Sequence, residues 1–138
     1  MNAFTSSDWT MYPFASINKK DYYNLLDVYL QAVFFPKLEE INFAQEGHRL
    51  EFSTPNDPST KLEIKGVVYN EMKGALSSPQ RIMDVKKTEQ LFPTVTYHHC
   101  SGGDPKNIPD LTYEQFVNFH KTHYHPSNSF IYSYGDFD

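Results

Sequence analysis

A single carboxylate, Glu71, interrupts an otherwise apolar run that has the spacing of a helix. The run reads Lys65-Gly66-Val67-Val68-Tyr69-Asn70-Glu71-Met72-Lys73-Gly74. An acid in such a place either lies on a solvated face or is held inside the protein to bind a metal or transfer a proton. The run by itself leaves both interpretations open.

Histidines offer a second candidate for metal chemistry. His120 and His123 are three positions apart on an expected helix, and such a pair can hold a transition metal. Histidines on one helix face more often pack in the core or cap the helix, and we favour that role here. Cys100 follows two histidines and could be a reactive thiol, although an ordinary loop cysteine is the commoner case.

The elements that must position these residues alternate between helices and strands. Periodicity predicts helices over residues 21–35, 39–45, 66–76, 79–90 and 113–123, and strands over 49–53, 61–64 and 129–134. Residues 2–16 are expected to be extended, and residues 92–110 to form a long ordered loop. Asn18 is expected to cap the first helix, and Thr112 with Gln115 to form a capping box for the last. The buried face of that last helix is expected to comprise Tyr113, Phe116, Val117 and His120.

A hairpin mixed with short crossovers favours an α+β fold, with a mostly antiparallel sheet and helices packed on one face. The 138 residues suffice for one domain with a core, but not for two. The net charge of −5 argues against a nucleic-acid partner. No apolar run approaches the roughly 20 residues that a membrane span needs, so we expect no membrane partner. One cysteine excludes a disulfide within the chain and favours a reducing compartment.

Four segments, in this order, carry a resemblance to a known family. They are Asn2-Ala3-Phe4-Thr5-Ser6-Ser7-Asp8-Trp9-Thr10-Met11-Tyr12, the run around Glu71, Ser101-Gly102-Gly103-Asp104-Pro105 and His123-Tyr124-His125-Pro126-Ser127-Asn128. The chain resembles the insulinase/pitrilysin-type zinc metallopeptidases, most closely the presequence-protease branch, from residue 2 to about residue 136. The resemblance implies that residues 1–138 form a single partial domain, part of the N-terminal zinc peptidase domain.

The resemblance also implies roles for particular residues. Asn70-Glu71-Met72-Lys73-Gly74 matches the segment that carries the third zinc ligand, which gives that role to Glu71. Asn2, Ala3, Phe4 and Thr5 match an edge strand whose main chain pairs with an extended substrate. The alternatives are a surface glutamate paired with a lysine and an ordinary sheet strand.

The family's H-x-x-E-H helix, which supplies the other two ligands and the general base, is absent from these residues. The nearest match is His48-Arg49-Leu50-Glu51-Phe52, with Phe in place of the second His. It falls in an expected strand, where positions i and i+4 lie about 13 Å apart. Residues 101–104 likewise lack the G-x-x-x-x-G-K-[ST] pattern of a phosphate loop.

We therefore expect a fragment of a zinc-dependent metalloendopeptidase that degrades unfolded peptides and is inactive alone. Its partners would be peptide substrates and the remaining parts of the same peptidase, in a bacterial cytoplasm or an organelle matrix. The alternatives are a non-catalytic peptide-binding module and a structural fragment. An H-x-x-E-H immediately upstream in the reading frame would separate the peptidase from the peptide-binding module.

Overall fold

The computed structural model describes residues 2–136, which form two compact units. One unit combines residues 2–14 with 38–111, and the other combines residues 15–37 with 112–136. Each unit joins segments that are distant in the sequence, and each is described by itself. The expectation of a single partial domain over residues 1–138 stays a prediction.

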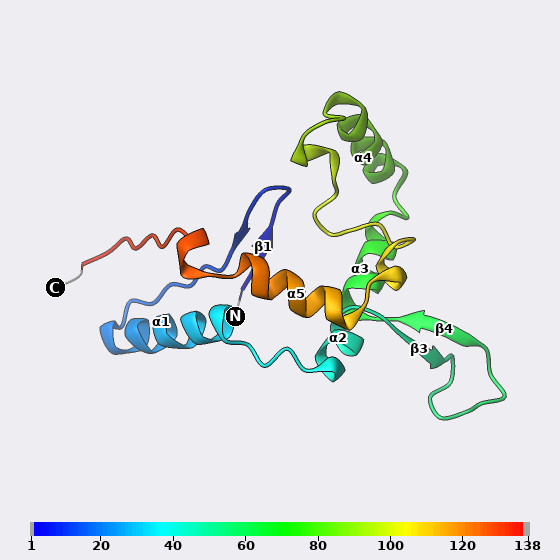
Figure 1. Ribbon diagram of the computed structural model, residues 1–138, viewed down its shortest axis with the longest axis horizontal. Coiled ribbons are helices and arrows are strands. Elements are labelled where there is room, and N and C mark those ends of the chain that lie inside the picture. The colour runs from blue at the N-terminus through cyan, green and yellow to red at the C-terminus, as the bar shows by residue number, and fades with distance from the viewer. Residues whose placement is uncertain (1, 137–138) are drawn as a thin grey trace. The chain divides into compact units, whose positions relative to one another are not determined.

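The secondary structure confirms an α+β fold with antiparallel strands (Figure 1). The helices are α1 (Lys19–Phe34), α2 (Glu40–Glu46), α3 (Val67–Ala75), α4 (Pro79–Leu91) and α5 (Tyr113–His123). The strands are β1 (Phe4–Thr5), β2 (Thr10–Met11), β3 (Arg49–Phe52) and β4 (Leu62–Lys65). The strands form two antiparallel ribbons, β1 with β2 and β3 with β4. Short 3₁₀ turns at Thr96–His98 and Ile108–Asp110 interrupt the long loop expected over residues 92–110.

The β3–β4 ribbon has the register that the alternation of apolar residues predicts. Leu50 lies opposite Ile64. The turn between the strands is stabilised by Asp57, whose Oδ1 accepts a hydrogen bond of 3.0 Å from the Ser59 N–H. Asn56 adopts φ +63°, a left-handed conformation that asparagine tolerates better than most residues. The polar turn sequence therefore closes the hairpin as expected.

Gly66 joins β4 to α3 where two stretches of backbone come close together. A Cβ at Gly66 would overlap the Gly47 carbonyl oxygen and lie 2.9 Å from the His48 Cα. Gly66 is buried, and no side chain fits there. This contact fixes where α3 begins, and α3 carries Glu71.

The unit that contains α1 and α5 is organised around the middle of α1. Asn18 caps α1 as predicted, because its Oδ1 accepts a hydrogen bond of 3.1 Å from the Asp21 N–H. Tyr29 is the buried residue of α1. His120 of α5 donates from Nε2 to the Val33 carbonyl at 2.8 Å, which joins the two helices.

The start of α5 is confirmed, but its buried face is only partly as expected. Thr112 and Gln115 form the predicted capping box. Val117 and His120 are half-buried, whereas Phe116 is 37% exposed. The prediction that Phe116 is buried is therefore wrong. Phe116 lies beside the row of α5 residues that packs against the rest of the unit.

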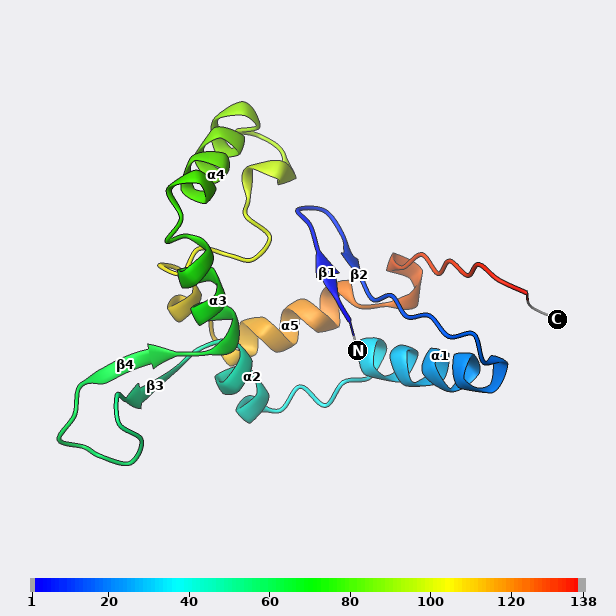
Figure 2. The same ribbon diagram turned by 180° about the vertical axis from the view of Figure 1, so that it is seen from behind.

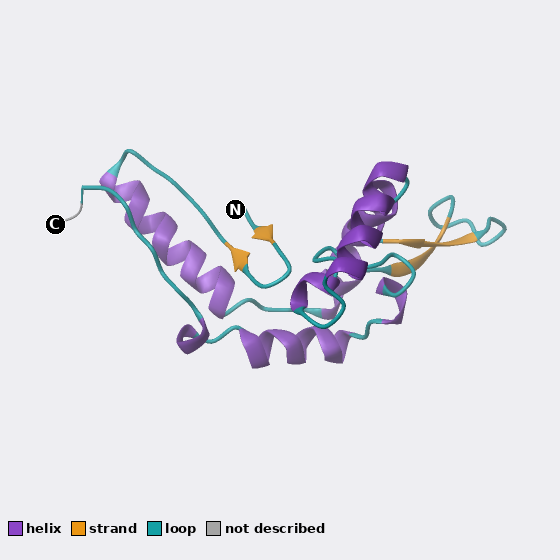
Figure 3. Ribbon diagram, turned by 90° about the horizontal axis from the view of Figure 1, so that it is seen from above, coloured by secondary structure: helices purple, strands orange, loops and turns teal. Residues whose placement is uncertain are grey.

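The strand predicted over residues 129–134 is wrong. These residues adopt no β structure, and Figure 3 draws them as loop. A strand needs a neighbouring backbone to complete its hydrogen bonds, and every strand within residues 2–136 pairs only in β1–β2 or β3–β4. Tyr22 donates to the Ser133 hydroxyl at 3.0 Å, while Phe130 and Tyr134 are 89% and 90% exposed.

Burial is slight in both units. Within residues 2–136 the buried apolar side chains are Tyr29 and Ile108, one in each unit. Many large apolar residues are exposed, and contiguous exposed apolar surface commonly marks a face that another element covers. No helix in the described part of the chain is long and apolar enough to cross a membrane.

Candidate functional site

Helix α3 presents two different faces. Tyr69, Met72 and Leu76 are half-buried and face their own unit. Successive helical residues turn by about 100°, so the opposite face is made by a second set of residues. This exposed face comprises Val67, Val68, Glu71, Gly74 and Ala75.

Glu71 lies at the centre of that exposed face of α3. Its neighbours Val67 and Val68 are 45% and 39% exposed, and a Cβ at Gly74 would meet no atom within 4 Å. Within residues 2–136 the Glu71 carboxylate forms no hydrogen bond or ion pair. The helix around Glu71 is confirmed, whereas its role as a ligand stays a prediction.

The candidate substrate strand is shorter than expected. Phe4 and Thr5 form β1, while Asn2 and Ala3 precede it. Figure 2 shows β1 and β2 joined as a narrow hairpin, and within residues 2–136 β1 pairs only with β2. One long edge of β1 is therefore not occupied by another described strand.

The register of the hairpin shows which backbone groups face that edge. The Ser6 N–H donates to the Trp9 carbonyl at 2.9 Å, and Thr5 lies opposite Thr10. Bonded and non-bonded pairs alternate along an antiparallel ladder, so the Thr5 N–H and C=O point away from β2. The edge of β1 thus presents the main chain of Thr5.

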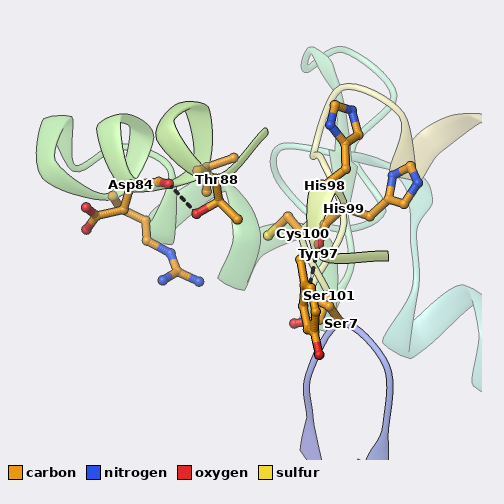
Figure 4. A pocket seen from close by; sticks show the side chains of 10 residues that line it. Ser7, Asp84, Thr88, Tyr97, His98, His99, Cys100 and Ser101 are labelled. Carbon is orange, nitrogen blue, oxygen red and sulfur yellow. Dashed lines mark hydrogen bonds between the residues drawn. The ribbon is translucent and has the colours of Figure 1, made fainter. Parts of the chain in front are cut away.

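An open pocket in the same unit was not anticipated from the sequence (Figure 4). Its lining includes Ser7, Asp84, Thr88, Tyr97, Cys100 and Ser101. Hydrogen bonds from Gln80 and then Lys87 hold the pKa of Asp84 below its usual range. Asp84 is therefore a charged surface carboxylate near neutral pH and is not suited to donate a proton. The sequence contains no local pattern that predicts this pocket, because its walls come from three separate segments: β1–β2, α4 and the loop after α4.

Both histidines of the alternative pair hydrogen-bond a backbone carbonyl. His120 donates from Nε2 to the Val33 carbonyl, and His123 donates from Nδ1 to the Phe119 carbonyl at 3.0 Å. The donating nitrogen has no lone pair for a metal, but the other ring nitrogen of each histidine keeps one, so the histidine alternative stays a prediction. In the near match to H-x-x-E-H over residues 48–52, His48 directly precedes β3 and the other four residues form that strand, so the segment is not a helix. No group of three or more His, Cys, Asp or Glu residues that could hold a metal exists within residues 2–136.

Comparison with known proteins shows which proteins the chain is similar to. No protein-family model matches it. Presequence protease, mitochondrial, of Xenopus tropicalis is 55% identical over 136 residues, which are 99% of this chain and 13% of the relative. The protein of the same name from Schizosaccharomyces pombe is 53% identical over 137 residues, 99% of this chain and 14% of the relative. Presequence protease 1, chloroplastic/mitochondrial, of Arabidopsis thaliana is 54% identical over 140 residues, 100% of this chain and 13% of the relative.

The chain thus spans about 13% of the length of the Xenopus and Arabidopsis relatives that it matches. Identity of this level, continuous over nearly the whole chain, confirms the resemblance found in the sequence motifs. The chain is homologous to a part of presequence protease, in agreement with the resemblance to insulinase/pitrilysin-type metallopeptidases that its motifs carry.

Proposed function

We propose that this chain is part of a zinc metalloendopeptidase that degrades unfolded peptides, with Glu71 as a zinc ligand and β1 as the strand that pairs with the substrate. The relatives are named as presequence proteases, and their names place them in mitochondria or chloroplasts. We accordingly propose an organelle matrix as the location.

The observation that carries the role of Glu71 is its place on α3. Val67 and Val68 leave apolar surface in water around a carboxylate that has no partner within residues 2–136. Covering apolar surface gains roughly 25 cal/mol per Å², so a second element packed on this face would be stabilising and would enclose Glu71. An enclosed carboxylate must be neutralised or paired with a cation. A metal ion bound by the carboxylate meets that requirement.

The residues present fit one part of a zinc site. Carboxylate oxygens are accepted zinc ligands, and Glu71 supplies one such donor. The described residues supply no group of three donors, so the other ligands belong to the remaining parts of the same peptidase. The chemistry that bound zinc supplies is polarisation of a carbonyl and acidification of a water. On this proposal the 138-residue chain cleaves no peptide by itself.

The edge of β1 supports extended, unfolded peptides as substrates. A peptide that adds as a strand satisfies its own backbone groups through main-chain pairing, which tolerates many sequences. The outward N–H of Thr5 offers one such pairing position, while its carbonyl accepts a long hydrogen bond from the Ser101 hydroxyl. Ala3, just before β1, has a small side chain that permits close approach.

The test is Glu71→Gln in the full-length protein, with metal content and turnover both measured. Substitutions outside the ligand shell of metal sites typically cost 10–100-fold in affinity, so loss of a ligand should lower zinc affinity by more than about 100-fold. Glu71→Asp keeps the charge but withdraws the carboxylate by one methylene, and should retain part of the zinc. Glu40→Gln, at an exposed site on α2, is the control and should retain all of it. Full zinc content and normal turnover in Glu71→Gln would refute the role.

A second candidate, capture of peptides without cleavage, is favoured by the same edge of β1. An H-x-x-E-H motif upstream in the coding frame would decide for the peptidase. A full-length protein that binds extended peptides but lacks this motif would decide for capture.

A further inference from the structure

One segment, residues 97–102, contacts both elements that the proposed function uses. At the β1–β2 hairpin, the Tyr97 hydroxyl donates to the Asp8 carboxylate at 3.0 Å, and the Ser7 hydroxyl donates to the His99 carbonyl at 3.3 Å. Figure 4 shows Ser7, Tyr97 and Ser101 gathered at the end of the pocket nearest the hairpin. The Tyr97–Asp8 bond is the strongest of these contacts, because its acceptor is charged.

Ser101 meets the hairpin at the outer edge of β1. Its hydroxyl donates to the Thr5 carbonyl at 3.4 Å, and the register of the hairpin turns this carbonyl away from β2. The separation is long for a bond between oxygens, so this bond is weak and exchanges readily. A strand added along β1 therefore meets Ser101 at Thr5.

The other end of the segment contacts α3. A Cβ at Gly102 would overlap the Met72 Sδ and lie 3.0 Å from the Met72 Cε. Met72 follows Glu71 and belongs to the half-buried face of α3. The loop at Gly102 thus lies directly against the Met72 side chain of the helix that carries the candidate ligand.

Helix α4 anchors the middle of the segment. His98 donates from Nδ1 to the Glu89 carbonyl at 3.1 Å. The hairpin, α3 and α4 belong to one compact unit, so these contacts can act together.

We propose that residues 97–102 position a bound peptide relative to Glu71. Ser101 limits how far the peptide can pair along β1, while the contacts of Tyr97 and Gly102 keep the hairpin and α3 in a fixed position relative to each other. This inference rests on the proposed function of β1 and Glu71. Tyr97, Ser101 and Gly102 are positioning residues, because they act through β1 and α3. The hydrogen bond to Asp8 raises the pKa of Tyr97, so the phenol remains a donor throughout the neutral range.

The experiment compares two variants of the full-length protein. The test variant combines Ser7→Ala, Tyr97→Phe and Ser101→Ala. The control combines Ser53→Ala with Tyr132→Phe, two exposed residues whose hydroxyls form no hydrogen bond within residues 2–136.

Three measurements are made on each variant: amide exchange over residues 2–11, the cleavage positions along one unstructured peptide, and zinc content. In the test variant we expect hairpin exchange about tenfold faster, cleavage spread over neighbouring bonds, and unchanged zinc. Tyr97→Phe alone should show the same changes to a smaller degree, which keeps the test valid if the triple variant fails to fold.

Exchange rates and cleavage positions equal to those of the control would overturn the inference. Faster exchange with an unchanged cleavage map would also overturn it, because the segment would then stabilise the hairpin without setting the register. Failure of the proposed function is seen separately, as normal zinc and turnover in Glu71→Gln.

Discussion

Replacement of Gly66 tests whether the β4–α3 junction sets the position of Glu71. The change is Gly66→Ala in the full-length protein. Gly74→Ala is the matched control, because it adds the same methyl group to the same helix where nothing lies within 4 Å. At Gly66, the N-cap of α3, the new Cβ meets backbone, whereas at Gly74, within α3, it meets no described atom.

The structure gives the size and sign of each effect. At Gly66 the new Cβ would lie 2.7 Å from the Gly47 carbonyl carbon and 2.9 Å from the His48 Cα. Favourable carbon contacts begin near 3.5 Å, so the 2.7 Å contact requires the junction to open by about 0.8 Å. All these atoms are backbone, so no rotamer relieves the overlap, and overpacking of this kind costs about 1–3 kcal/mol. At Gly74, removing a helical glycine should stabilise the protein by about 0.5–1 kcal/mol.

The assay is amide hydrogen exchange over residues 62–76, together with zinc content. The two variants should differ by about 1.5–4 kcal/mol in opening free energy, which is about 12- to 700-fold in exchange rate. We also expect Gly66→Ala to lower zinc content, because α3 must shift. Equal exchange in the two variants would show that the close approach of Gly66 to Gly47 does not exist in solution.

Two further predictions concern other elements. Thr112→Ala removes one half of the capping box that it forms with Gln115, and should cost about 1 kcal/mol, measured as faster amide exchange in the first turn of α5. Hydrogen bonds from Arg49 and then Lys65 lower the pKa of Glu51. The stabilisation of the β3–β4 ribbon by Glu51 should therefore be complete above the ordinary glutamate pKa of about 4.3, and be lost as the pH falls through the lowered value. Urea midpoints measured at about pH 5 and pH 3 should show a fall that Glu51→Gln makes smaller; an identical fall in the variant would assign it to other carboxylates, such as Asp84.

Local chemistry allowed the caps and the hairpin to be predicted from the sequence. Asn18 and Thr112 each bond a backbone N–H three residues away, so the sequence around each one contains the whole interaction. The β3–β4 register follows from apolar alternation, because a slip by one residue would turn every side chain to the other face. The spacing of apolar residues likewise predicted that Glu71 lies on a helix.

Homology to presequence protease was also visible in the sequence, through ordered motifs. The comparisons confirm it over nearly the whole chain. The roles of Glu71 and of residues 2–5 stay predictions, since a ligand is defined by a metal and a docking strand by its peptide.

Tertiary structure alone decided which strands exist and what holds the candidate site together. The extended residues 129–134 look like a strand in sequence, but a strand forms only where another backbone pairs with it. Tyr97 bonds Asp8 across 89 positions, and Ser101 bonds Thr5 across 96. Contacts over such separations follow from how the chain closes on itself, which leaves no periodic pattern in the residues that make them.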